Sequence, residues 1–155
     1  DRIVALESTV AHEIGHQWVF NVVGKDQVDH PGLDEAVVQY LTYRYFLDFR
    51  GPEAAQGYVE NWQGRWQRVD NENIPIGLPA REYTATEYSA IVYGRGPIFI
   101  KTLSERMGVS TFDVFLRDYA RQNWWGIGTP QQFKQLAEEH CRCDLTGLFD
   151  EWVNP

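Results

Sequence analysis

The sequence predicts a mainly α-helical protein, a bundle of six to seven helices. Apolar residues recur at intervals of three and four along most of the chain, which is the periodicity of helices. Glycine and proline fall where such helices would end or begin. No stretch alternates apolar and polar residues over enough positions to indicate a strand. The chain has 155 residues, of which 43% are hydrophobic, so it can bury a substantial core.

Three helices are expected in the first part of the chain. The first covers residues 2–23 and ends at Gly24, with one apolar face made of Ile3, Leu6, Val10, Ile14 and Trp18. A polar loop follows, and the second helix covers residues 33–49. The pair Gly51-Pro52 ends that helix and starts the third, at residues 53–68.

The rest of the chain reads as one irregular loop and further short helices. Residues 70–79 hold two prolines and several polar residues, so they are expected to form the loop. A short helix at residues 84–93 is followed by Gly94-Arg95-Gly96-Pro97 and then by a helix that ends at Gly108.

Two helix starts are marked by capping patterns. Ser110, with Asp113 three residues later, predicts the N-terminus of a helix that runs to about residue 121. Thr129, followed by Pro130 and Gln132, predicts the next helix start. The last amphipathic segment carries Leu145, Leu148, Phe149 and Trp152.

Composition narrows the possible partners. The chain carries 14 Lys and Arg against 22 Asp and Glu, a net charge of −8, which argues against nucleic acid and anionic membranes as partners. No apolar run approaches the roughly 20 residues that a membrane span needs, and no signal peptide is recognisable, so the compartment stays open. Cys141 and Cys143 are one residue apart, and we expect free thiols because a bridge would close a very small ring.

One sequence motif indicates a catalytic metal site. His12-Glu13-Ile14-Gly15-His16 matches the H-E-x-x-H pattern on the first expected helix. Residues four apart on a helix project from the same face, so His12 and His16 can both ligate one zinc ion. Glu13 points about 100° away from His12 around the helix, where it can take a proton from the attacking water without ligating the metal.

A catalytic zinc site needs a third protein ligand. A metzincin would have glycine and histidine where this chain has Val19 and Val22, which excludes that class. Glu35 stands near the start of the second helix, separated from the motif by a spacer of eighteen residues. That spacer is long enough to finish the first helix, turn and return antiparallel, so Glu35 is expected to face the histidines as the third ligand of one zinc ion per chain.

Together these segments resemble a known family. The stretch from His12 to Trp18, the eighteen-residue spacer and Leu33-Asp34-Glu35-Ala36 are similar to the gluzincin metallopeptidases of the aminopeptidase N and leukotriene hydrolase family. The segment from Tyr88 to Pro97 resembles that family's Y-x-x-x-x-Y-x-K-G-A pattern, with Arg95 and Pro97 as departures. The resemblance implies that the chain is the helical lobe of a thermolysin-like zinc peptidase domain over residues 1–155, without the N-terminal β lobe and with the remainder of a larger parent protein as a partner.

The resemblance also assigns two tyrosines. It gives Tyr93 the role of stabilising the tetrahedral intermediate, and it makes Tyr88 a neighbouring substrate-binding residue. On a straight helix, residues five apart point about 140° away from each other, so both tyrosines reach one cleft only if the helix is bent or wound differently there.

The sequence therefore predicts a zinc-dependent peptidase that hydrolyses peptide or protein substrates, as an aminopeptidase in its full-length form. The segment that would hold a substrate's free amino group in this family lies upstream and is not in this chain. Two alternatives stay open: an inactive module of the same fold that binds a peptide or partner, and a zinc hydrolase acting on small molecules.

Overall fold

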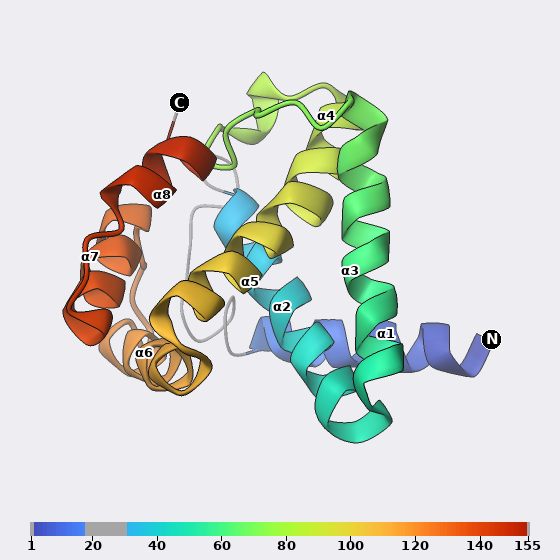
Figure 1. The fold of residues 1–155 in the computed structure, drawn as a ribbon, viewed down its shortest axis with the longest axis horizontal. Helices are drawn as coiled ribbons and strands as arrows, with labels where there is room; N and C mark the ends of the chain where they lie inside the picture. The colour runs from blue at the N-terminus through green and yellow to red at the C-terminus, as the bar shows by residue number, and fades with distance from the viewer. Residues whose placement is uncertain (1, 18–30, 155) are drawn as a thin grey trace.

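The computed structural model describes residues 2–17 and 31–154, and this part of the chain is helical, with no β-strand (Figure 1). The expected end of the first helix, with Trp18 and Gly24, lies outside the described residues. The α-helices are α1 (Arg2–His16), α2 (Pro31–Arg50), α3 (Pro52–Trp66), α4 (Ala85–Ala90), α5 (Gly96–Met107), α6 (Val109–Gln122), α7 (Pro130–Cys141) and α8 (Thr146–Trp152). The shorter elements are two 3-10 turns, η2 (Gln67–Val69) and η3 (Ala80–Glu82), and the π-helix η4 (Ile91–Arg95).

Helix α2 is the central element of the bundle. It packs against α5, α3, η4 and α1, while α6 and α7 form a second pair that α5 joins to the rest (Figure 1). The core between these helices contains many aromatic side chains, among them Phe99, Phe112, Phe115, Phe133 and Phe149. This arrangement confirms the mainly α-helical bundle predicted from the sequence.

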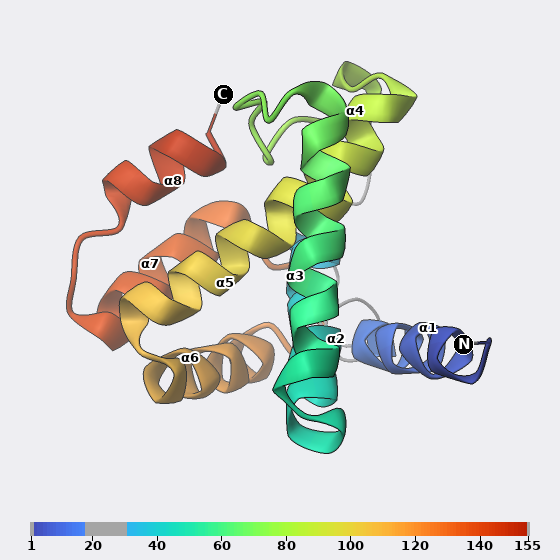
Figure 2. The same cartoon turned by 45° about the vertical axis from the view of Figure 1, so that its right-hand side comes forward.

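Helix α1 lies at the edge of the bundle and packs on α2, as both ribbon views show (Figure 2). No residue of α1 is buried. Its apolar positions are present as expected, yet Ile3 is 71% exposed and Leu6 is 65% exposed. A salt bridge attaches α1 to α2, because Arg50 Nη2 donates to Glu7 Oε2 at 2.6 Å.

The expected break after residue 93 is wrong. From Ala85 to Met107 the chain is one continuous helical path, in which η4 joins α4 to α5. Thr84 begins it with a capping box, since its hydroxyl accepts from the Glu87 N–H while the Glu87 carboxylate accepts from the Thr84 N–H. Pro97 lies at the start of α5, directly after the π-helix, where the winding changes from π to α.

Two other expectations are also wrong. Helix α6 begins at Val109 after Gly108, without a side-chain cap, because Asp113 instead accepts two hydrogen bonds from Arg44 at 3.0 and 3.3 Å. Cys141 and Cys143 form a disulfide. The chain leaves α7 through Arg142 in the left-handed conformation, and this turn brings the two Cα atoms to 5.2 Å, within the range of a bridge. The expected cap at Thr129 is confirmed, with Gln132 completing the box.

Candidate metal centre

The two motif histidines lie in the last turns of α1, on the face turned toward α2. Their Nε2 atoms are 3.0 Å apart, and the rings meet edge to face with centroids 4.6 Å apart. Both side chains are about five-sixths buried, with 17% and 15% of their surface exposed. The spacing of four residues therefore does place both imidazoles at one point, as the helix geometry predicts.

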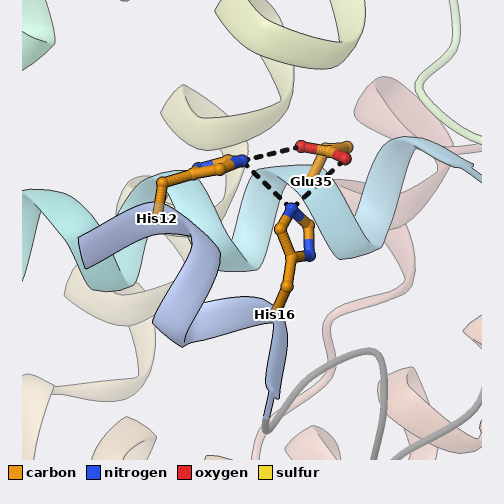
Figure 3. A group of neighbouring side chains, drawn as sticks. All are labelled: His12, His16 and Glu35. Carbon is orange, nitrogen blue, oxygen red and sulfur yellow. Dashed lines mark hydrogen bonds and ion pairs between the residues drawn. The ribbon is translucent and has the colours of Figure 1, made fainter. Parts of the chain in front are cut away.

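Glu35 completes the group from the first turns of α2. Its Oε2 lies 3.5 Å from His12 Nε2, and its Oε1 lies 3.5 Å from His16 Nε2. Figure 3 shows the two rings and the carboxylate pointing toward one another from the two helices. The three side chains offer ligand atoms that all lie within 4.8 Å of one another.

The start of α2 is held in place by the core around it. Asp34 and Ala36, on either side of Glu35, are buried, while Glu35 itself stays partly exposed on the side of α1. Gly32 permits this close packing, since a Cβ there would lie 2.2 Å from the carbonyl oxygen of Ile76. The first turn of α2 is thus packed directly against the loop at residue 76.

The spacing of the three groups fits a divalent metal ion. A tetrahedral site with bonds of about 2.0–2.1 Å separates its ligand atoms by about 3.3 Å, close to the 3.0, 3.5 and 3.5 Å found here. Two imidazole nitrogens and one carboxylate oxygen form a donor set that suits zinc and leaves a fourth position open. Glu13 follows His12 on α1 and is exposed.

Tyr88 and Tyr93 come together because of the π-helix. Within η4 the hydrogen bonds reach back five residues, as in the Gly96 N–H to the carbonyl oxygen of Ile91. This wider winding reduces the angle between residues five apart, and the rings of Tyr88 in α4 and Tyr93 in η4 have centroids 6.1 Å apart. The sequence required a differently wound helix if Tyr88 and Tyr93 were to lie on the same side, and the π-helix η4 is such a helix.

Tyr93 also lies near the carboxylate of the centre. Burial raises the pKa of the Tyr93 phenol above its ordinary value, and the negative charge of Glu35 and a hydrogen bond with Glu35 raise it further. Burial and Glu35 raise the pKa of Tyr88 in the same direction. Both phenols therefore keep their protons at neutral pH and can donate hydrogen bonds. The structure therefore brings the two tyrosines close to each other and to Glu35.

Comparison with known proteins identifies the family of this chain. The family model described as the Peptidase family M1 domain matches residues 1–152. The chain belongs to the M1 peptidase family. The family resemblance seen in the sequence is thereby confirmed. No solved structure matches the chain significantly.

Curated relatives of this M1 chain are distant and much longer. It is 21% identical to "Probable M1 family aminopeptidase 1" of Encephalitozoon cuniculi, over 94% of this chain and 18% of the relative. It is 22% identical to "Aminopeptidase 2, mitochondrial" of Saccharomyces cerevisiae, over 99% of this chain and 17% of the relative. "Glutamyl aminopeptidase" of Bos taurus is 19% identical, over 95% of this chain and 16% of the relative. The M1 chain thus spans less than a fifth of the length of these relatives.

Two further features of the M1 chain bear on the sequence predictions. Among the described residues, no helix is long and apolar enough to cross a membrane.

Arg65 of α3 lies over the ring of Tyr93, with its guanidinium carbon 5.8 Å from the ring centre. The sequence did not single out this arginine, because nothing in the local pattern of α3 connects it with a tyrosine 28 residues later.

Proposed function

We propose that this chain is the metal-binding helical lobe of a zinc-dependent M1 peptidase. The observation that carries the proposal is the convergence of His12, His16 and Glu35 at distances that match a tetrahedral site. These three side chains would hold one zinc ion per chain. Family membership supports a peptidase, and the donor set supports zinc as its metal.

The chemistry follows from the residues around the centre. A bound zinc ion would polarise the substrate carbonyl and lower the pKa of a coordinated water toward about 7. Glu13 is the general base: its carboxylate accepts the proton of the attacking water and passes it to the leaving amine. Tyr93 donates its phenolic hydrogen to the oxygen that becomes negative as the carbonyl is attacked. Tyr88, beside Tyr93, contacts the bound substrate.

The proposed substrates are peptides with a free amino terminus, hydrolysed by a longer protein. The relatives named as aminopeptidases support this substrate class, and the chain covers less than a fifth of their length. We therefore propose that residues 1–155 form one lobe of the catalytic domain. In this proposal the β lobe and the group that holds the substrate's amino terminus belong to the remainder of the parent protein.

The metal content of the purified protein tests the site. We expect about one zinc per chain in the wild type, measured by mass spectrometry of the metal, and loss of zinc in His16→Ala and in Glu35→Ala. Glu60→Ala, an exposed glutamate on α3, is the matched control and should keep the metal. Zinc binding that is unchanged in Glu35→Ala would contradict the proposed ligand set.

Activity tests the reaction separately. In the full-length protein, Glu13→Gln should keep zinc and lose peptide hydrolysis, because the amide cannot accept the proton of the attacking water. A wild type that binds zinc but hydrolyses no aminoacyl or peptide substrate would overturn the proposed reaction and favour a binding module.

A further inference from the structure

Arg65 is held above Tyr93 by hydrogen bonds to two helices. Its Nε donates to Asn61 Oδ1 at 3.0 Å on its own helix α3, and its Nη1 donates to Ser89 Oγ at 3.3 Å on α4. The guanidinium lies over the Tyr93 ring at 5.8 Å, a geometry in which the positive charge is attracted to the face of the aromatic ring. Arg65 thus bridges α3 to the helical path that carries both Tyr88 and Tyr93.

The backbone next to Tyr93 is pressed against the same part of α3. A Cβ at Gly94 would lie 2.9 Å from the carbonyl oxygen of Trp62 and 3.0 Å from the Cβ of Arg65. The π-helix η4 therefore packs against α3 next to Arg65. The side chain of Arg65 also contacts the face of the Tyr93 ring. The Tyr93 ring thus has the Arg65 guanidinium over it and the Tyr88 ring near it.

We propose that Arg65 is a positioning residue that fixes the phenol of Tyr93 toward the metal centre. The inference rests on the proposed function, in which Tyr93 donates to the developing negative charge. Such a donor acts only if it is already aimed at that oxygen, and a displacement of about 1 Å can cost about a hundredfold in rate. Arg65 orients the phenol through its contact with the ring face and is itself held by its hydrogen bond to Ser89. In this proposal it does not contact the reacting atoms.

Kinetics of the full-length protein test the proposal. Arg65→Ala should lower kcat by about tenfold to a hundredfold with KM changed by less than about twofold, because the donor acts in the transition state. Arg65→Lys keeps the positive charge but loses the planar guanidinium group, so its kcat should lie between those of Arg65→Ala and the wild type. Arg68→Ala, an exposed arginine one turn further along, is the matched control and should leave both constants unchanged. Zinc content should be the same in all four proteins.

A double-mutant cycle separates positioning from a structural role. In a Tyr93→Phe background, Arg65→Ala should lower kcat by no more than about twofold, because the hydroxyl that it aims is already gone. An equally large loss in that background would overturn the proposal. A rise in KM at constant kcat would also overturn it, since Arg65 would then bind substrate.

A readout without catalysis distinguishes this proposal from the proposed function. With 3-fluorotyrosine placed at position 93 of the same protein, Arg65→Ala should shift or broaden its single fluorine resonance, and Arg68→Ala should not. A shifted resonance in a protein that hydrolyses no peptide would overturn the proposed function and leave the positioning intact. An unchanged resonance in Arg65→Ala would overturn the positioning, whatever the activity.

Discussion

The guanidinium of Arg95 lies at the carboxyl end of α8, where it donates to the carbonyl oxygen of Trp152 at 2.6 Å. It also donates to the carbonyl oxygens of Glu151 at 2.7 Å and Ile74 at 3.0 Å. Arg95 is fully buried, and its guanidinium carbon lies 4.7 Å from the centre of the Trp152 ring. Since Arg95 is the last residue of η4, two positions after Tyr93, this contact connects the end of the chain to the candidate site.

Arg95→Met should destabilise the protein strongly. The variant keeps an unbranched stem but removes the donors from three backbone carbonyls, and hydrogen bonds to a charged donor contribute about 1.5–3 kcal/mol each. We expect a loss of about 3 kcal/mol or more in the free energy of unfolding, measured by urea denaturation. Arg106→Met, an exposed arginine on α5, is the control and should change stability by less than about 0.5 kcal/mol. Equal stability of the two variants would contradict this account.

Gly94→Ala tests the close packing of η4 against α3. The added methyl group would lie 2.9 Å from two backbone atoms, the carbonyl oxygen of Trp62 and the nitrogen of Trp66, so one helix must shift. We expect a loss of about 1–3 kcal/mol in the free energy of unfolding, as for other overpacked sites. Gly57→Ala on α3 is the matched control. Nothing lies within 4 Å of its added Cβ, so that variant should gain up to about 1 kcal/mol from the better helix propensity of alanine.

Zinc should stabilise the chain through His12, His16 and Glu35. A ligand at 100 times its Kd stabilises the folded state by about 2.7 kcal/mol, so the unfolding temperature should rise with added zinc and fall again with chelator. The increase should be absent in His16→Ala and retained in His140→Ala, whose imidazole pairs with Asp118 on α6 at 3.3 Å. An equal increase in His16→Ala would mean that zinc binds elsewhere.

The sequence predicted those features that depend on local spacing. His12 and His16 are four apart on one helix, and Glu35 needs only a turn of sufficient length to face them, so both relations can be read from the chain. The bundle itself follows from helical periodicity and from caps such as Thr129.

Features that depend on tertiary contacts could not be predicted in this way. The π-helix brings Tyr88 and Tyr93 together, yet its extra residue is accommodated by contacts of Gly94 with α3 and of Arg95 with α8. Asp113 has the spacing of a capping residue but pairs with Arg44, which is 69 residues away. The disulfide of Cys141 and Cys143 depends on the left-handed conformation of Arg142, and no local sequence pattern predicted that conformation.

Replacing each tyrosine in turn distinguishes their roles in the full-length protein. Tyr93→Phe removes the proposed donor to the developing negative charge and should lower kcat by about a hundredfold to a thousandfold, with KM nearly unchanged. Tyr88→Phe should have a smaller effect, seen in KM, because this ring lies beside Tyr93 and contacts substrate in the proposed mechanism. Neither variant loses a proposed ligand, so steady-state kinetics with zinc content as the control separates the two roles. If Tyr88→Phe lowered kcat as much as Tyr93→Phe, or if Tyr93→Phe were fully active, the assignment of the donor to Tyr93 would be wrong.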